Sequence, residues 1–171
     1  TTWYINWSIS IASDTYFANT TLLLSANSSI QTQSFLTDNS NNNLLLTATG
    51  VPSAQNFNPY QAGYYSNIFS SAYLSTTNTA AQYGSSNFTI ECWLNPTALS
   101  GANVFYCYGY QSTSTRSTLA YLNSGNLRFA FSPDGSTSTD SSLGAHGMTV
   151  GNWYHVAIVR NGSTVTGYVN G

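Results

Sequence analysis

Charge is what this sequence of 171 residues has least of. Only 5% of the residues are Asp, Glu, Lys or Arg, against about 25% in an average soluble domain. There is no lysine, and the arginines are Arg116, Arg128 and Arg160. Binding to duplex nucleic acid depends on Lys and Arg clusters that neutralise several phosphates. The composition therefore excludes nucleic acid, and anionic membrane surfaces for the same reason, as expected partners.

Long hydrophobic runs are also missing. No stretch reaches the roughly 20 apolar residues that a transmembrane helix needs, so we expect no membrane insertion. The first twenty residues lack the basic start and continuous apolar segment of a secretory signal. Disorder is not expected, because 42% of the residues are hydrophobic and 15% aromatic, whereas disordered chains combine low hydrophobicity with high charge.

Helical periodicity is nearly absent, and alternation with a period of two replaces it. In Phe88–Leu94 the residues Phe88, Ile90, Cys92 and Leu94 fall on one face, and Asn95-Pro96 ends the run because proline cannot donate to a strand ladder. The residues 1–11 alternate more loosely, as an edge strand or an arm from a preceding domain would. Other strands are predicted at Val104–Tyr110, Ser117–Leu122, Asn126–Phe131, Trp153–Val159 and Thr164–Val169.

The last two of these segments flank Asn161-Gly162, a strong β-hairpin signal because tight turns need positive φ, which Asn and Gly tolerate. Many short strands with turn residues between them are typical of an antiparallel sandwich or barrel. No alternation of strands with helices is present, so a parallel sheet is not expected. The sequence thus predicts an all-β fold.

Three motifs carry a family resemblance. FTIECWLNP at Phe88–Pro96, WYHVAIVR at Trp153–Arg160 and GYVNG at Gly167–Gly171 occur in this order, and together they resemble the laminin-G-like, concanavalin A-like jelly-roll domain. The resemblance covers about residues 64–171 and implies a two-sheet antiparallel β-sandwich. Residues 1–63 are expected to be an N-terminal extension of short strands and loops that contributes strands to the sandwich. This extension loosely resembles the leader of such domains in phage and environmental viral structural proteins.

Members of this family continue with further strands after the Asn-Gly turn. The resemblance therefore implies that the jelly roll is incomplete at the C-terminal end of this sequence. Tyr168 and Val169 are expected to lie in a strand whose next neighbour is missing from the chain, unordered or donated by a partner.

Carboxylates and histidines offer few candidates for chemistry. Glycoside hydrolysis usually needs two carboxylates facing each other across the substrate, but Glu91 is the only glutamate and no second acid follows it on its strand. We therefore expect no enzymatic activity. His146 and His155 lack Cys, Asp or Glu at metal-ligand spacing, and His155 is expected to pack beside Trp153 or to bond a backbone carbonyl.

Two aspartates leave a calcium site as an alternative. Asp134 and Asp140 flank a Ser/Thr-rich stretch, and two carboxylates with backbone carbonyls could supply part of the six to eight oxygens that calcium takes. The segment Ser132–Gly135 equally fits a β-turn with Pro at the second position and Gly at the fourth. No other cofactor is expected.

Cys92 and Cys107 lie on successive predicted strands. If those strands pair, a disulfide between the two is geometrically feasible. Each cysteine also fits as a small buried apolar residue with a free thiol, since nothing else in the sequence marks a disulfide framework.

Tyr106, Tyr108 and Tyr110 alternate along one predicted strand in a neutral sequence rich in Ser, Thr and Asn. Aromatic rings beside polar side chains are what a glycan-binding surface or a protein interface uses. Such residues also build the core of a sandwich. Glycan contact, subunit contact and core packing therefore all remain open for these tyrosines.

Together these features predict a non-enzymatic structural or adhesion protein outside the cell, on a virion surface as a tail, fibre or capsid-surface component. A homo-oligomer or other virion proteins are the expected partners, with glycan as a further ligand. The alternatives are a secreted carbohydrate-binding adhesin module of a cellular protein and a fragment of a jelly-roll glycan hydrolase. The lack of lysine suits an external setting, because trypsin-like proteases would find only three arginines.

Overall fold

Short antiparallel strands make up nearly all of the regular structure, as the alternation predicts. The computed structural model describes residues 16–26, 36–55, 58–59, 65–77, 79, 84–109, 118–132 and 137–171. The strand expected within residues 1–11 lies outside these ranges. The chain forms two compact units, one from Thr1–Phe57 and Ala62–Ala81 and the other, here called the C-terminal unit, from Asn58–Gln61 and Gln82–Gly171.

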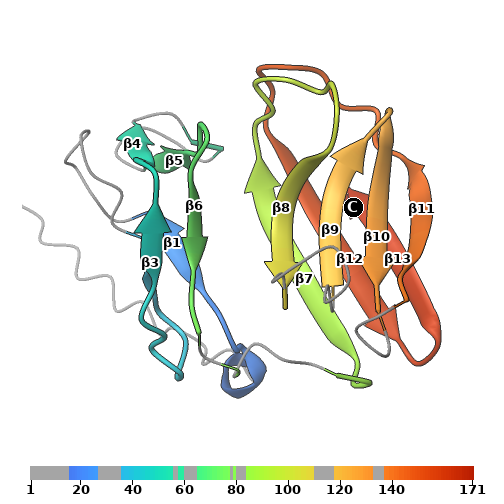
Figure 1. Cartoon of the computed structure of the whole chain (residues 1–171), viewed down its shortest axis with the longest axis horizontal. Coiled ribbons are helices and arrows are strands. Elements are labelled where there is room, and N and C mark those ends of the chain that lie inside the picture. Colours follow the sequence, from blue (N-terminus) through green and yellow to red (C-terminus); the bar gives the residue numbers. More distant parts are fainter. Residues whose placement is uncertain are drawn as a thin grey trace, which may run out of the picture. The chain divides into compact units, whose positions relative to one another are not determined.

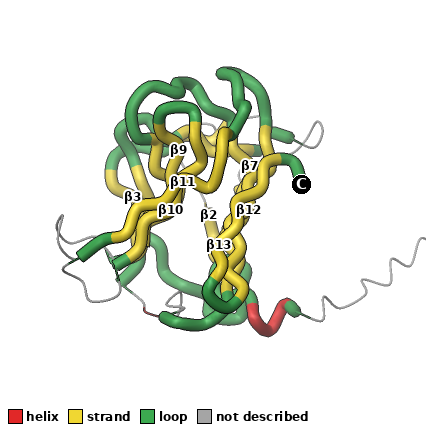
Figure 2. Tube along the Cα trace, turned by 90° about the vertical axis from the view of Figure 1, so that its right-hand side faces the viewer, coloured by secondary structure: helices red, strands yellow, loops and turns green. Residues whose placement is uncertain are grey.

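The C-terminal unit contains two antiparallel sheets. One has the order β11-β10-β9-β8 and the other the order β13-β12-β7. Figure 1 shows the first sheet lying in front of the second, and the turned view of Figure 2 shows them as two layers. Their strands are β7 (Phe88–Leu94), β8 (Asn103–Tyr108), β9 (Thr118–Asn123), β10 (Asn126–Phe131), β11 (Thr139–Ala145), β12 (Tyr154–Asn161) and β13 (Thr164–Val169).

The hydrophobic core fills the space between these sheets. Ala120, Leu122, Leu127 and Phe129 come from the four-stranded sheet, and Val156 and Ile158, both 0% exposed, come from the three-stranded sheet. The ring of Phe88 on β7 lies 5.7 Å from that of Phe129 on β10 and so joins the two sheets. Phe88, Ile90 and Leu94 all pack against this core, which is the face predicted for them. The all-β sandwich is thus confirmed.

The hairpin of β12 and β13 forms where it was predicted, with Asn161 opposite Thr164. The two loop residues are Gly162 and Ser163 rather than Asn161 and Gly162. Gly162 has a φ of 62°, and the first loop position of a type II′ turn requires such a value. The glycine therefore sets the position of the turn, and Asn161 stays in the strand.

Gly167 lets β13 approach the opposite sheet closely. A Cβ atom at this position would lie 2.6 Å from Cδ2 of Leu127 and 3.0 Å from Cβ of Leu143. Cβ atoms in proteins essentially never come as close as 2.6 Å to another heavy atom, so any larger residue here would require at least the Leu127 side chain to move. This close approach makes Leu127 and Leu143 part of the inner surface at the β13 edge.

The first unit, here called the N-terminal unit, contains in its described residues three short strand pairs and a single-turn 3₁₀ helix, η1 (Phe17–Asn19). The pairs are β1 (Leu24–Ala26) with β2 (Leu36–Asp38), β3 (Thr47–Thr49) with β6 (Tyr73–Ser75), and β4 (Ser53–Gln55) with β5 (Ser66–Ile68). Strands β5 and β6 follow residue 64 but pair within this unit. The division of the chain at residues 63 and 64 stays a prediction. No helix in the described ranges is long and apolar enough to cross a membrane.

Candidate functional site

The three tyrosines singled out in the sequence belong to β8 and the residues after it. A bulge shifts the register of β8 between Val104 and Tyr106, and Tyr106 packs against the hydrophobic core. Tyr108 is half-buried and lies opposite Thr118 at the end of the same strand. Tyr110 lies outside the described residues. Tyr106 therefore packs against the core. Glycan or interface contact by Tyr108 and Tyr110 stays a prediction.

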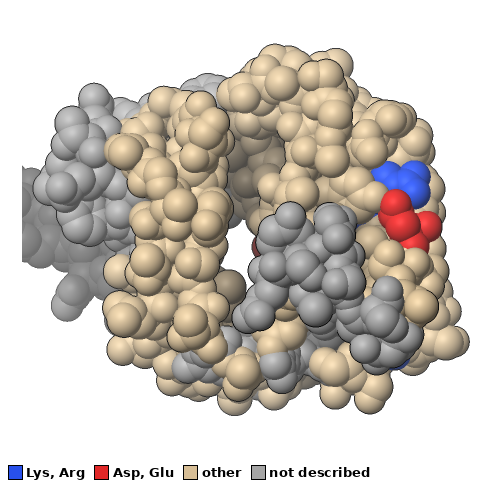
Figure 3. All heavy atoms as spheres, in the orientation of Figure 1, with Lys and Arg blue, Asp and Glu red and all other residues tan. Residues whose placement is uncertain are grey.

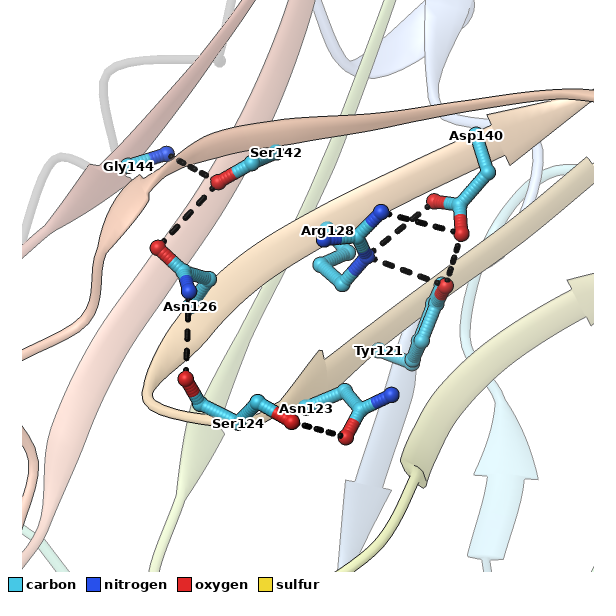
Figure 4. A network of polar contacts seen from close by, with 8 residues as sticks. All are labelled: Tyr121, Asn123, Ser124, Asn126, Arg128, Asp140, Ser142 and Gly144. Atoms are coloured by element: carbon cyan, nitrogen blue, oxygen red, sulfur yellow. Dashed lines mark hydrogen bonds and ion pairs between the residues drawn. The ribbon is translucent and has the colours of Figure 1, made fainter.

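Asp140 lies on β11 within a polar network on the outer face of the four-stranded sheet (Figure 4). Its carboxylate accepts a 2.6 Å hydrogen bond from the Tyr121 hydroxyl and one of 3.2 Å from Nε of Arg128. A terminal nitrogen of Arg128 lies 3.1 Å from the same carboxylate. Figure 3 shows neighbouring blue and red side chains bordered by tan ones on this face. The network holds β9, β10 and β11 together through their side chains.

Electrostatics agree with this structural role of Asp140. Burial raises the pKa of its carboxyl, but the hydrogen bonds from Tyr121 and Arg128 outweigh that effect and lower the pKa below its usual value. Burial and the bond to Asp140 raise the pKa of Tyr121. Asp134, the other aspartate of the suggested calcium site, lies outside the described residues. In the described ranges no group of three or more His, Cys, Asp or Glu side chains gathers as metal ligands would. The calcium site stays a prediction.

The two cysteines lie in different sheets, Cys92 on β7 and Cys107 on β8, and neither forms a disulfide in this structure. Burial, followed by the charge of Glu91, raises the pKa of the Cys92 thiol to about 12. A thiol that stays protonated at neutral pH is a poor nucleophile. Cys107 is exposed. Cys92 is half-buried, so of the two cysteines only Cys92 comes near the buried position that was one of the two expectations.

His146 has a structural role at the end of β11. Its side chain is buried, and its Nδ1 accepts a 2.9 Å hydrogen bond from the Met148 backbone N–H. The His146 backbone N–H in turn donates to the Gly125 carbonyl. These bonds fix the chain where it leaves β11.

A second polar and aromatic surface covers the outer face of the three-stranded sheet. Because successive side chains of a strand point to opposite faces and Ile90 and Leu94 face the core, Glu91 and Trp93 point outward. The same alternation along β12 and β13 turns His155, Ala157 and Tyr168 to this outer face. We call this surface the outer platform, formed by Glu91, Trp93, His155, Ala157 and Tyr168.

The pairing register fixes how the platform is arranged. Trp93 lies opposite His155, and Ala157 lies between Glu91 and Tyr168. The Trp93 and His155 rings are 5.3 Å apart, and Nε2 of His155 is 3.6 Å from a carboxylate oxygen of Glu91. His155 had been expected to pack beside Trp153 or to bond a backbone carbonyl, and both stay predictions. Antiparallel pairing places Trp93 directly across the strand from His155, which accounts for the contact between their rings.

Exposure and side-chain size make the platform accessible. Trp93 and Tyr168 are 40% and 44% exposed, whereas the small Ala157 between the strands is 8% exposed. Strand spacing of about 4.8 Å puts the backbones of Glu91 and Tyr168 about 10 Å apart. The surface is therefore low at Ala157. The exposed rings of Trp93 and Tyr168, the Glu91 carboxylate and the His155 imidazole surround this position. Such an arrangement can stack on a sugar ring and bond its hydroxyl groups.

Sequence reasoning considered Glu91 and His155 one at a time and missed the platform. The signal that could have found it is the register of the hairpin. Once Asn161 is set opposite Thr164, Tyr168 falls opposite Ala157 on the face that carries His155. The pairing of β7 with β12 was not readable in this way, because a long connection separates these strands.

Comparison with known proteins agrees with the architecture. A family model described as the concanavalin A-like lectin/glucanases superfamily matches residues 69–171. A crystal structure of the binding domain of Paraclostridial Mosquitocidal Protein 1 is similar in fold, with a TM-score of 0.56 at 16% sequence identity over 87% of this chain. The chain spans 38% of the length of that structure. No curated protein sequence matches the chain.

Proposed function

The chain belongs to the concanavalin A-like lectin/glucanase superfamily, and from that premise we propose that it is a non-enzymatic adhesion module that binds glycans on its outer platform. The observation that carries the proposal is the pair of exposed rings, Trp93 and Tyr168, around the Glu91–His155 pair. Rings supply apolar faces for sugar stacking, and the polar pair supplies hydrogen-bond partners for hydroxyl groups.

The near-neutral surface favours an uncharged ligand. The formal net charge is −2, and Glu91 is the one acidic residue of the platform. A strongly anionic ligand would face that carboxylate without a nearby lysine or arginine on the platform. Neutral hexoses and N-acetylhexosamines fit this surface better than sulfated or sialylated glycans do.

The positions of the carboxylates support a binding role over hydrolysis. Glu91 faces outward from the three-stranded sheet. Asp140, which lies opposite the outward-facing Ala130, faces outward from the four-stranded sheet. These two carboxylates, the ones that the structure describes in the C-terminal unit, are on opposite outer faces of the sandwich, so they cannot flank one glycosidic bond.

Glycan-array binding tests the proposal. The full chain should bind a set of neutral glycans, and Trp93→Ala or Tyr168→Ala should each weaken that binding about tenfold or more, as truncation of a central aromatic contact usually does. Isothermal titration with the best array ligand would give the change in Kd. Tyr73→Ala is a matched control, because Tyr73 is also an exposed aromatic on a strand but lies in the N-terminal unit.

Binding that persists in both platform variants would contradict the role of the platform. An array on which no glycan binds the parent chain would contradict glycan recognition itself. Thermal unfolding of each variant should match the parent closely, since Trp93 and Tyr168 lie on the solvent side of their sheet.

We place this module on the surface of a viral particle, as part of a tail, fibre or capsid. The low charge, the absence of lysine and the loose resemblance of the N-terminal extension, residues 1–63, to viral leaders support this setting. Immunogold labelling with an antibody to the C-terminal unit should mark intact particles. Labelling confined to a cell surface would instead support a cellular adhesin.

A further inference from the structure

The outer face of the three-stranded sheet continues beyond the platform toward the turn between β12 and β13. Alternate residues of a strand point to the same side, so Val159 follows Ala157 on this face. The neighbours of Val159 across the sheet are Thr89 on β7 and Thr166 on β13. One more pair, beside the hairpin turn, completes the face. We call this part of the face the threonine strip, formed by Thr89, Val159, Asn161, Thr164 and Thr166.

The polar side chains of the threonine strip are exposed and available. Val159 in the middle is half-buried, while the threonines and Asn161 around it are exposed. Among the residues that the structure describes, none forms a hydrogen bond with the hydroxyl groups of Thr89 and Thr166. A hydroxyl group donates one hydrogen bond and can accept two. The strip therefore offers unused donors and acceptors on both sides of an apolar centre.

The threonine strip carries no charge. The strands β7, β12 and β13 contain one acidic residue, Glu91 on the platform, and one arginine, Arg160. Arg160 lies opposite Phe88, which packs against the core, so it points to the other side of the sheet. Its guanidinium donates to the carbonyls of Gly162 and Gly84 over 3.0 and 3.2 Å. A ligand on the strip thus meets hydroxyl, amide and methyl groups, which suit the hydroxyl and C–H groups of a neutral sugar.

Regular pairing makes the platform and the threonine strip one continuous surface. Strand β12 pairs with β7 and with β13 without a shift in register. Beside the strip, the Gly162 N–H donates to Oδ1 of Asn87 over 2.8 Å, which ties the hairpin turn to the chain before β7. With a rise of about 3.4 Å per residue, the outward-facing residues from His155 to Asn161 extend over about 20 Å. A single sugar ring covers only part of this length.

We infer that the outer platform and the threonine strip together bind a linear, neutral oligosaccharide whose chain runs along β12. This inference rests on the proposed function and extends it from the platform to the neighbouring strip. One sugar lies on the platform against Trp93 and Tyr168. The sugars that follow lie over Val159, where Thr89 and Thr166 bond hydroxyl groups on the two sides of the chain. Because the sheet is already formed, little order is lost on binding, and each further sugar adds affinity.

The length of the glycan is the first test. The probes are a monosaccharide and the tetrasaccharide of the same linear, neutral series, chosen from the glycan that binds the full chain best on the array. Isothermal titration should give a Kd for the tetrasaccharide at least about tenfold lower than that for the monosaccharide. Equal Kd values, corrected for the number of sugars in each probe, would overturn the inference and leave the platform as a site for one sugar.

Removing the two hydroxyl groups tests the strip itself. Thr89→Val and Thr166→Val keep the branched shape of the side chain and suit an exposed strand position. Each should weaken tetrasaccharide binding about threefold to tenfold, since one hydrogen bond is lost, and should leave monosaccharide binding unchanged. Thr139→Val is the matched control, because Thr139 is also an exposed threonine on a strand but belongs to the four-stranded sheet. This variant should bind both probes as the parent does.

Comparison with a platform variant separates this inference from the proposed function. Trp93→Ala should weaken the binding of both probes, whereas the threonine variants should act on the tetrasaccharide alone. If Trp93→Ala weakens binding and neither threonine variant does, the inference is wrong and the proposed function stands. If the parent binds neither probe, both are wrong.

Backbone amide chemical shifts give a readout without any substitution. In the parent chain, the monosaccharide should shift the amide signals of Trp93 and Tyr168 on the platform. The tetrasaccharide should shift those of Thr89, Val159 and Thr166 as well. Shifts that stay confined to the platform with the tetrasaccharide would also overturn the inference.

Discussion

Replacing Phe129 by alanine is expected to lower the free energy of unfolding of the C-terminal unit by about 3–5 kcal/mol. Phe129 is 4% exposed, and its ring contacts Phe88 from the opposite sheet and Phe131 from its own strand, at centroid distances of 5.7 and 6.3 Å. Alanine would leave a cavity between sheets that Phe88 alone cannot fill. Since small domains have only about 5–15 kcal/mol of stability in total, urea unfolding should shift to a much lower midpoint.

Phe131→Ala is the matched control for this experiment. Phe131 occupies the same strand two residues further on, but it is 41% exposed. The same loss of a ring should therefore cost clearly less there. Equal destabilisation by the two substitutions would mean that the contact between Phe88 and Phe129 is not what holds the sheets together.

The strands that build this core were predictable because their local pattern agrees with their environment. Phe88–Leu94 and Thr164–Val169 were predicted with the bounds that β7 and β13 have. In both, one face is apolar and meets the core while the other meets solvent. The alternation alone thus identifies which side chains are inside, and the Asn-Gly sequence identifies the hairpin.

Strand β11 was missed for a physical reason. Its sequence, TDSSLGA, has one large apolar residue, and most of its side chains are exposed. What holds it is pairing with β10 and the network in which Arg128 and Tyr121 bind Asp140. Such pairing is a property of the assembled sheet and leaves no periodic signal in the strand. This is why Asp140 was considered for a loop site rather than a strand.

The outer platform was missed for a similar reason: its residues come together only when the strands pair. Trp93 and His155 are distant in the sequence, and only the pairing of β7 with β12 brings their rings to 5.3 Å. The tyrosines of β8 were attractive as a run with a period of two. A bulge after Val104 changes the register there, and a bulge is not visible in this sequence. The sequence therefore identified candidate residues one at a time, whereas their grouping into one surface follows only from the pairing of the strands.

The N-terminal unit is organised by a buried carboxylate, that of Asp38, which is 5% exposed. One of its oxygens accepts 2.9 Å hydrogen bonds from the backbone N–H groups of Leu23 and Ser40. The other accepts 2.8 Å bonds from the Leu44 N–H and the Ser40 hydroxyl. Burial raises the pKa of Asp38, but these bonds outweigh it and lower the pKa below its ordinary value of 3.8. The ionised carboxylate thus ties the end of β2 to the segments around it.

Asp38→Asn is expected to destabilise this unit by about 2–4 kcal/mol at neutral pH. The amide keeps one acceptor oxygen but turns an NH₂ group toward the Leu44 N–H, and bonds to a charged acceptor contribute about 1.5–3 kcal/mol each. The amides of Leu23 and Leu44 should then exchange at least about thirtyfold faster. The same change at the exposed Asp140, Asp140→Asn, is the control and should leave these two amides unchanged.

The pH dependence of this effect follows from the direction of the pKa shift. Because the folded-state pKa of Asp38 lies below 3.8, its contribution to stability is complete above about pH 5 and is lost as the pH falls through the folded-state value. Denaturant unfolding of the parent and of Asp38→Asn should therefore differ at pH 7 and converge toward pH 2. A difference that stayed constant between these pH values would mean that the shape of Asp38, and not its charge, holds the N-terminal unit together.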